Sequence, residues 1–214
     1  GMVSARDLKL LYRADKLNDN TGIYGVVGNP VMHSLSPQIH NPGFQRIHYN
    51  AVYVPFLADS IRSFLSLAEM LRMRGFSVTV PFKVDVLKYL GNITREVKLI
   101  GSCNTVVRVP NMWKGTNTDY YGFIHPIEKE IDEGRIKSAL IIGAGGAAKA
   151  IIWALKMRNI KVTIVNRTKS KADELATLYG VASDSLENIS LYEGKVDLVV
   201  QATKMGLHPY EDVN

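Results

Sequence analysis

The stretch SALIIGAGGAAK, residues 138–149, decides the fold of this 214-residue chain. It begins with the apolar run ALII, which is typical of a short strand buried on both faces of a parallel sheet. A glycine turn follows, and then the run AAKAIIWALKMR at 147–158, which has the composition of a helix. A second apolar strand is predicted at 161–165. Strand, glycine turn, helix and strand in this order form the context that a dinucleotide-binding turn requires.

The small residues of the turn follow the pattern Gly143-x-Gly145-x-x-Ala148. The first glycine permits the tight turn, and the second lets the backbone approach a pyrophosphate without a Cβ atom in the way. Ala148 keeps the helix close to the strand, and the helix N-terminus offers N–H groups and a partial positive charge to a phosphate. Glycine turns also join strands to helices for structural reasons alone, but the complete context favours cofactor binding. The predicted contacts in this turn are Gly143, Ala144, Gly145, Gly146, Ala147 and Ala148.

The composition, with 46% hydrophobic and 21% charged residues, is that of an ordinary folded protein. No apolar run approaches the roughly 20 residues that span a bilayer, so we expect no membrane segment. The single cysteine, Cys103, rules out an internal disulfide, fits the reducing cytoplasm and is expected to be a small buried hydrophobic side chain. The net charge of +6 is dispersed, without a block of Lys and Arg. We therefore expect an acidic, phosphorylated small molecule as the partner, and no nucleic acid.

Strands and helices alternate along most of the chain. A short amphipathic helix and an Asn/Asp-rich linker are predicted within residues 3–20. The strands predicted after it lie at 23–28, 51–56, 76–80, 103–109 and 112–116, and the last two form a hairpin. The helical segments lie at 37–49, 60–74, 82–89, 94–99 and 119–133. This alternation predicts a layered, mostly parallel α/β sheet.

The segment after the glycine turn continues the same pattern, with a helix at 170–179 and a strand at 197–202. Together with the strands at 139–142 and 161–165, this makes three parallel strands, whereas a complete dinucleotide-binding domain has about six. We therefore expect the C-terminal part of this domain to be absent from the chain.

Four motifs occur in order along the chain: GNPVMHSLSP at 28–37, GFSVTVPFK at 75–83, GTNTDYYG at 115–122, and the GAGGAA turn followed by NRT at 166–168. Together they resemble the shikimate dehydrogenase family, and the resemblance extends from about Ile23 to Gly206. The first three motifs in this order are highly specific, whereas the glycine turn alone occurs in many proteins.

The resemblance implies an α/β protein of two lobes with a cleft between them. It implies a substrate-binding catalytic domain at 21–122 and a Rossmann-like NADP-binding domain at 123–214. Residues 1–20 would then be an N-terminal extension or a fusion linker.

Ser34 and Ser36 lie two residues apart on the turn after the first strand, so both hydroxyls can face one pocket. A hydroxyl both donates and accepts hydrogen bonds, which suits a carboxylate or a ring hydroxyl. An alternative is a serine turn that caps the helix beginning near Pro37. The resemblance implies that the two serines hold the substrate carboxylate.

Thr79 and Lys83 flank Pro81 at the carboxyl end of a predicted strand, where ligands bind in open α/β sheets. The resemblance implies that Lys83 is the proton donor and acceptor at the reacting oxygen. It pairs Lys83 with Asp119, although Asp119 can also be interpreted as the N-cap of a helix.

The resemblance also implies that neutral side chains bind the substrate hydroxyls, namely Thr79, Asn104 and Asn117. Ser77 departs from the family pattern, in which asparagine is usual at this point.

The cofactor can be inferred from the end of the second strand of the dinucleotide-binding unit. NAD sites usually carry Asp or Glu there, and this chain has Asn166, 23 residues after Gly143. Arg167 follows, with Thr168, and a guanidinium pairs with a 2′-phosphate that a carboxylate would repel. Lys169 or Lys171 can assist. The sequence therefore predicts NADP, against the alternative of an arginine that only faces solvent.

The segment QATKMG at 201–206 partly matches a family stretch beside the nicotinamide, so Thr203 and Met205 are implied as cofactor contacts. His33, His40 and His48 lack the spacing of metal ligands, and we predict no metal.

The implied function is the NADP-dependent, reversible reduction of 3-dehydroshikimate to shikimate, by a cytoplasmic enzyme. A quinate/shikimate dehydrogenase and a non-catalytic NADP-binding module are the two alternatives. The segment ARDLKLLYRADKLN, followed by IYGVVGNP, resembles the junction with an upstream 3-dehydroquinate dehydratase, so a fused dehydratase domain is a further expectation.

Overall fold

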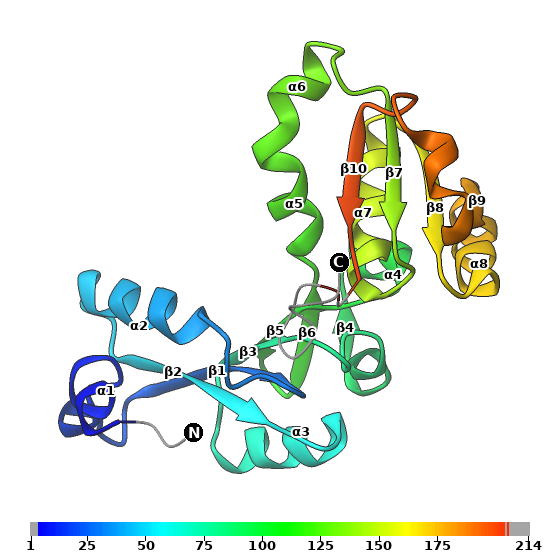
Figure 1. Cartoon of the computed structure of the whole chain (residues 1–214). Helices are drawn as coiled ribbons and strands as arrows, with labels where there is room; N and C mark the ends of the chain where they lie inside the picture. Colours follow the sequence, from blue (N-terminus) through cyan, green and yellow to red (C-terminus); the bar gives the residue numbers. More distant parts are fainter. Residues whose placement is uncertain (1–3, 204, 206–214) are drawn as a thin grey trace. The chain divides into compact units, whose positions relative to one another are not determined.

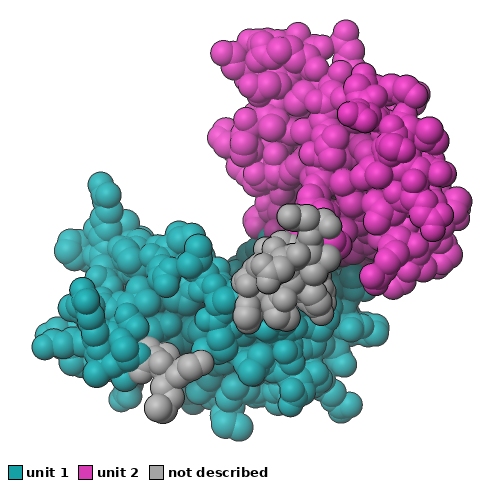
Figure 2. Space-filling model, viewed as in Figure 1, with its two compact units in different colours: residues 1–98, 102–117 teal, residues 99–101, 118–214 magenta. Residues whose placement is uncertain are grey.

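The computed structural model describes residues 4–203 and 205, which form two compact units (Figure 2). The first unit consists of the chain up to Lys98 together with Ser102–Asn117. The second consists of Leu99–Gly101 together with the chain from Thr118 onward. Each unit has its own sheet and its own hydrophobic core.

The first unit contains a six-stranded sheet. Its strands are β1 (Gly22–Gly28), β2 (Ala51–Leu57), β3 (Gly75–Val78), β4 (Asn92–Ile93), β5 (Thr105–Val109) and β6 (Met112–Thr116). Its helical segments are α1 (Ala5–Leu10), η1 (Ala14–Lys16), α2 (Ser36–Arg46), α3 (Ile61–Met70), η2 (Asp85–Tyr89) and α4 (Arg95–Ile100), of which the last ends in the second unit.

The strand order β2-β1-β3-β5-β6-β4 can be followed in Figure 1. β1 lies between β2 and β3 and is parallel to both, and the antiparallel hairpin β5–β6 adds to β3 in antiparallel orientation. β6 therefore runs in the same direction as β1, β2 and β3. The carboxyl ends of these four strands and the start of β5 share one edge of the sheet, and most of the predicted substrate-binding residues belong to this edge.

Alternate residues of β1 point into two separate cores. Val27 packs with Phe64 of α3 and Phe76 of β3 on one face. Val26 packs with Tyr53 of β2 and the partly buried Phe44 of α2 on the other face. α2 and α3 thus cover opposite faces of the sheet, which gives the layered arrangement that the alternation of strands and helices predicts.

The second unit contains a four-stranded sheet in the order β10-β7-β8-β9, in which every pair is parallel. Its strands are β7 (Ser138–Ile142), β8 (Lys161–Asn166), β9 (Ala182–Ser185) and β10 (Leu198–Gln201). Its helical segments are α5 (Asp119–Ile124), η3 (His125–Ile127), α6 (Glu128–Asp132), α7 (Gly146–Met157), α8 (Lys169–Tyr179) and η4 (Leu186–Tyr192).

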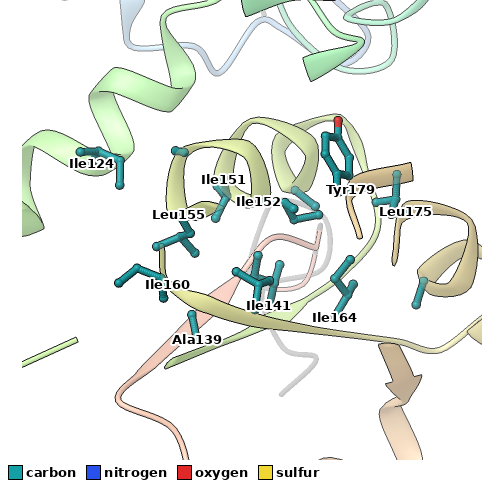
Figure 3. Packing of buried hydrophobic residues seen from close by; sticks show 14 of the residues in the cluster. Ile124, Ala139, Ile141, Ile151, Ile152, Leu155, Ile160, Ile164, Leu175 and Tyr179 are labelled. Atoms are coloured by element: carbon teal, nitrogen blue, oxygen red, sulfur yellow. The ribbon is translucent and has the colours of Figure 1, made fainter. Parts of the chain in front are cut away.

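α7 packs on this sheet through an apolar face (Figure 3). Ile151, Ile152 and Leu155 of α7 belong to one buried cluster with Ile141 of β7 and Ile164 of β8. Side chains of α5 and α8 join the same cluster. This packing fixes the start of α7 directly behind the carboxyl end of β7, where the glycine turn lies.

A hydrogen bond within the second unit holds the end of α4 in place. The hydroxyl of Tyr179 donates to the carbonyl oxygen of Ile100 at 2.6 Å, and both residues are buried. Burial raises the pKa of Tyr179 to about 12. The chain therefore enters the second unit at Leu99, returns to the first at Ser102 and crosses again after Asn117.

Several helices end with a residue in the left-handed conformation, which lets the next N–H groups bond the last open carbonyl oxygens. After α3, Arg72 has φ 49°, and the N–H groups of Arg72 and Met73 donate to Glu69 and Ala68. The same type of ending closes α2, α6, α7 and α8, at His48, Gly134, Asn159 and Gly180. Helix α3 is thus shorter than the predicted segment 60–74.

The prediction of three parallel strands in the second unit is wrong, because β9 adds a fourth. Its residues, ASDS, are all partly or fully exposed, so this edge strand carries no apolar run that would predict it. The two-residue strand β4 was also not predicted. The helix predicted at 119–133 is divided into α5, η3 and α6 at Pro126, which has no N–H to continue the helical ladder.

Within residues 4–203 and 205, no helix combines the length and the apolar character that crossing a membrane requires.

Candidate active site

The turn after β1 holds the two predicted carboxylate-binding serines next to each other. Ser34 donates from Oγ to Oγ of Ser36 at 3.1 Å, and it accepts from the backbone N–H of Ser36 at 3.3 Å. Both side chains are half-buried. The second bond is the serine turn considered as an alternative, and α2 begins directly there, at Ser36. The turn and the pairing of the hydroxyls coexist, since the turn itself brings the two oxygens together.

Thr79 and Lys83 follow β3 at the same edge of the sheet. The N–H of Thr79 donates to the carbonyl of Val27 at 2.9 Å, so the segment after β3 stays bonded to the end of β1. Phe82, 5% exposed, packs in the core and anchors the short turn. The carbonyl of Lys83 accepts from the N–H of Cys103 at 2.8 Å, and the Lys83 side chain is half-buried. The backbone on both sides of this lysine is therefore fixed.

Asn104 and Asn117 reach this edge from the hairpin strands. Asn104 comes just before β5, and its carbonyl accepts from the N–H of Val78 at 2.7 Å. Asn117 comes just after β6 and is 2% exposed, and its Nδ2 donates to the carbonyl oxygen of Ser102 at 3.0 Å. One donor of Asn117 thus supports the backbone before β5, which is a structural task beyond the predicted one.

Two polar residues near the serines are not among the sequence-predicted site residues. Tyr53 of β2 donates from its hydroxyl to Oγ of Ser77 on β3 at 2.8 Å. Burial raises the pKa of Tyr53, while hydrogen bonds with the hydroxyls of Ser77 and Ser36 oppose this rise. The Ser36 hydroxyl therefore belongs to a network that includes the departure from the family pattern at Ser77. Because β1 separates β2 from β3, no local signal in the sequence predicts this contact.

Asp119 begins α5 and is half-buried. It belongs to the second unit, whereas Lys83 belongs to the first. The pairing of these two side chains remains a prediction.

Gly143 follows β7 with φ 112°, a conformation that residues with a Cβ atom rarely adopt. A Cβ atom there would lie 3.0 Å from the carbonyl carbon and oxygen of Ala202 and 2.9 Å from Cγ2 of Thr203. The first glycine of the turn is thus required by both its backbone conformation and its protein neighbours. The same contacts place Thr203 beside the glycine turn, as the sequence predicts for a shared cofactor site.

Gly145 is different, because no atom of residues 4–203 and 205 explains its lack of a side chain. It is the N-cap of α7 with φ −92° and ψ −172°, an extended conformation open to any residue. A Cβ atom there would meet nothing within 4 Å in the part of the chain that the structure describes. The open space lies in front of the N-terminus of a 12-residue helix, where a pyrophosphate would approach the backbone. This cradle fits the dinucleotide that the sequence predicts.

The other predicted residues of the turn complete this arrangement. Ala148 is fully buried, which allows α7 to pack closely on the sheet, and Ala144 packs against the same core. Gly146 is the first residue of α7, and Ala147 is exposed.

The end of β8 presents an arginine and no carboxylate. Asn166 donates from Nδ2 to the carbonyl oxygen of Thr168 at 2.9 Å, which shapes the turn around the exposed Arg167. Lys169 bonds Asp173 at 2.7 Å, and this hydrogen bond is the main cause that lowers the pKa of Asp173. Since the ammonium of Lys169 is engaged by Asp173, Arg167 is the stronger candidate for a 2′-phosphate contact.

The turn after β10 is held by side-chain hydrogen bonds. Thr203 donates from Oγ1 to Oε1 of Gln201 at 2.9 Å and accepts from the N–H of Met205 at 3.1 Å. The Met205 side chain is 40% exposed. Gln201 thus orders the turn that carries Thr203 and Met205.

Among the residues that the structure describes, no group of three or more His, Cys, Asp and Glu side chains could hold a metal ion. Cys103 is fully buried and donates to backbone carbonyl oxygens of Thr105 and Thr116, as expected for a structural cysteine.

Comparisons with known proteins identify the family of this chain. A family model described as the shikimate dehydrogenase substrate binding domain matches residues 26–106, and one described as shikimate / quinate 5-dehydrogenase matches residues 127–208. A shikimate dehydrogenase (NADP(+)) of Caldanaerobacter subterraneus is 37% identical over 203 residues, which cover 91% of this chain and 72% of that protein.

Two further relatives extend the comparison. The bifunctional 3-dehydroquinate dehydratase/shikimate dehydrogenase of Arabidopsis thaliana, a chloroplastic protein, is 35% identical over 98% of this chain and 37% of its own length. The crystal structure of shikimate dehydrogenase from Aquifex aeolicus superimposes with a TM-score of 0.84 at 36% identity, covering 90% of this chain and 73% of that one. The resemblance drawn from the four motifs is confirmed, and the chain belongs to the shikimate dehydrogenase family.

Proposed function

We propose that this chain catalyses the reversible reduction of 3-dehydroshikimate to shikimate with NADPH, a step of the shikimate pathway that leads to chorismate and the aromatic amino acids. The reaction and the cofactor are those of its family. The observation that carries the proposal is the edge of the first sheet, where the backbone brings together two serine hydroxyls, a threonine, a lysine and two amides. An acid that carries several hydroxyl groups needs this set of partners.

We assign the substrate-binding domain to residues 21–122, most of which belong to the first unit, and the NADP-binding domain to residues 123–214 of the second unit. Leu99–Gly101 and 118–122 of the assigned substrate-binding domain belong to the second unit. Supporting this assignment, the polar edge belongs to the first unit and the glycine turn to the second. Residues 1–20, with α1 and η1, form an extension ahead of the first strand.

We assign the substrate carboxylate to the hydroxyls of Ser34 and Ser36. Thr79 and the amides of Asn104 and Asn117 bind the ring hydroxyls. An analogue without one of these hydroxyls leaves a buried amide unpaired, which makes such contacts strongly selective.

Lys83 and Asp119 carry out the proton transfer at the C3 oxygen. During reduction, the C3 carbonyl carbon gains a hydride while its oxygen gains a proton, and the Lys83 ammonium is the group assigned to donate this proton. Asp119 orients the ammonium. In the reverse direction the same pair takes the proton from the hydroxyl.

The second unit fits NADP, which supplies the hydride when bound. Gly143 makes the turn, Gly145 leaves the open space, and the α7 N-terminus faces the pyrophosphate. Arg167 pairs with the 2′-phosphate, and Thr203 and Met205 lie on the turn assigned to the nicotinamide side. Asn166, Thr168 and the three alanines of the glycine turn complete this set.

The test is to follow NADPH absorbance with shikimate and NADP, then with quinate, and to repeat both with NAD. Turnover that is fastest with shikimate and NADP supports the proposal. Faster turnover with quinate would assign the chain to the quinate/shikimate alternative. Clear NADP binding without turnover of either acid would make the chain a non-catalytic binding module.

We further propose that the native protein carries an upstream dehydratase domain and acts in the cytoplasm. The alignment with the Arabidopsis relative, which includes almost all of this chain, supports the fusion. Buried Cys103, with its thiol held in the core, is compatible with a reducing compartment. Determining the mass of the native protein and the fraction in which it is found tests both points.

A further inference from the structure

Four hydroxyl groups lie in series on the α2 face of the first sheet. Ser34 donates to Ser36 at 3.1 Å, and Tyr53 donates to Ser77 at 2.8 Å. Ser36 links the two pairs, because its hydroxyl, like that of Ser77, opposes the rise in the Tyr53 pKa that burial causes. The series begins on the turn after β1 and ends on β3.

Tyr53, in the middle of this series, is held firmly in place. The residue is only 4% exposed. The buried amide of Asn41 on α2 accepts from the N–H of Tyr53 at 2.8 Å and donates to its carbonyl oxygen at 2.9 Å. The His40 ring stacks on the Tyr53 ring, with 4.3 Å between centroids and 20° between planes. The Tyr53 hydroxyl therefore has a fixed position, although Ser34 and Ser36 lie on a turn.

We propose that Tyr53 is a positioning residue that orients the Ser36 hydroxyl toward the substrate carboxylate. The proposal rests on the proposed function, in which Ser34 and Ser36 bind this carboxylate. A carboxylate only accepts hydrogen bonds, so both serines must donate to it. Ser36 then no longer donates within the series and becomes an acceptor.

The series can meet this demand because each hydroxyl both donates and accepts. When Ser36 donates to the carboxylate, the Tyr53 hydroxyl rotates to donate to Ser36 Oγ, and Ser77 donates in turn to Tyr53. Each serine hydroxyl has a single hydrogen, so the Ser34–Ser36 bond gives way to the two bonds with the carboxylate. Beyond Ser36 only the direction of the hydrogen bonds reverses, and no proton leaves its oxygen. A hydroxyl that accepts such a bond is itself a better donor, because neighbouring hydrogen bonds polarise one another. Asparagine, usual at position 77 in the family, places an amide at the end of the series, whereas this chain ends it with another hydroxyl.

The test compares Tyr53→Phe with Tyr24→Phe. Tyr24 is opposite Tyr53 in the β1–β2 register, and its hydroxyl bonds Tyr49 outside the series, so it is a matched control. For Tyr53→Phe we expect the KM for shikimate to rise about fivefold, which corresponds to the ~1 kcal/mol of a single hydrogen bond. The kcat and the KM for NADP should stay within about twofold, and Tyr24→Phe should leave all three near wild type.

A second readout separates positioning from general loosening of the fold. Methyl shikimate has an ester in place of the carboxylate, so the charge that polarises the series is gone. The rise in KM caused by Tyr53→Phe should therefore be clearly smaller with the ester than with the acid. An equal rise with both substrates, or equal effects of Tyr24→Phe and Tyr53→Phe, would overturn the inference.

Ser36→Ala distinguishes this inference from the proposed function. If Ser36→Ala raises the KM for shikimate much more than that for the ester while Tyr53→Phe does not, the serines bind the carboxylate but Tyr53 does not position them. If Ser36→Ala fails to discriminate acid from ester, the carboxylate assignment itself is wrong. Ser77→Ala, expected to give a smaller effect of the same kind, checks the end of the series.

Discussion

Gly145→Ala is expected to separate NADP binding from stability, with Gly143→Ala as its counterpart. The two glycines belong to the same turn, but only Gly143 has a positive φ and a crowded Cβ position. At Gly145 the backbone is extended and the Cβ position is open. The two substitutions add the same methyl group, so a difference between them reports on what surrounds each position.

The effect on stability follows from these contacts. For Gly145→Ala, a helix N-cap prefers glycine over alanine by up to about 1 kcal/mol. The lost freedom of the unfolded chain offsets this by about 0.4–1 kcal/mol, so the net change should be small. For Gly143→Ala, about 1–3 kcal/mol of backbone strain adds to a similar cost of overpacking against Ala202. A loss of about 3 kcal/mol would lower the Tm by roughly 6–12 °C.

For NADP binding, Gly145→Ala is the more informative of the two substitutions. The new methyl group at Gly145 occupies the space in front of α7 and holds the pyrophosphate away from the backbone N–H groups. Losing one hydrogen bond to a charged group raises the Kd for NADP by about tenfold or more. Thermal unfolding by circular dichroism and titration with NADP measure the two quantities on the same samples. A Gly145→Ala protein that melts and binds NADP like the wild type would refute the argument that an approaching ligand explains this glycine.

Three further predictions address the catalytic lysine, the cofactor and the pH range. Lys83→Ala should lower kcat by about 10³-fold and leave the affinity for NADP unchanged. Lys88 is an exposed lysine paired with Asp85, and the control variant Lys88→Ala should have a kcat near that of the wild type. Similar rates for both variants would exclude the role assigned to Lys83. Arg167→Asp should reduce kcat/KM with NADP by about 10- to 100-fold and improve the relative use of NAD, and an unchanged NADP/NAD ratio would contradict the phosphate contact. Because the pKa of Tyr179 is raised to about 12 in the folded protein, its contribution to stability is complete below the unfolded value near 10 and is lost as pH rises from 10 to 12. Denaturation curves across this pH range should therefore show a loss that is reduced in Tyr179→Phe, and equal losses in both proteins would disprove it.

The fold was predictable where the signals are local. The run before Gly143 and the helix after it combine apolar pattern and glycine chemistry within twenty residues, and both elements are confirmed. β9 could not be predicted, because this polar edge strand pairs only with β8 and therefore has no apolar run. The end of α3 at Met70 depends on a left-handed residue, Arg72, and arginine gives no sign of this conformation.

The residues of the candidate site could be predicted from the sequence where they belong to a recognisable motif. Ser34 and Ser36 were identified from a turn and a resemblance, and the structure shows that their hydroxyls meet. The contact of Tyr53 with Ser77 could not be predicted, because it depends on the register of two strands that are not neighbours in the sheet. Lys83 and Asp119 belong to different units. No local sequence pattern determines whether their side chains pair.

The route of the chain through Leu99–Gly101 has a consequence for dissecting the protein. A gene fragment that stops at Asn117 would carry the buried side chain of Ile100 without the Tyr179 hydroxyl that bonds its carbonyl. A fragment that starts at Thr118 would lack Ile100 altogether, which leaves the Tyr179 hydroxyl without its acceptor. No single cut divides the polypeptide into the two units, because three peptide bonds join them. Each unit has its own core, yet the second unit includes a short segment from within the first, so exchanging one unit between relatives requires transferring Leu99–Gly101 with the second.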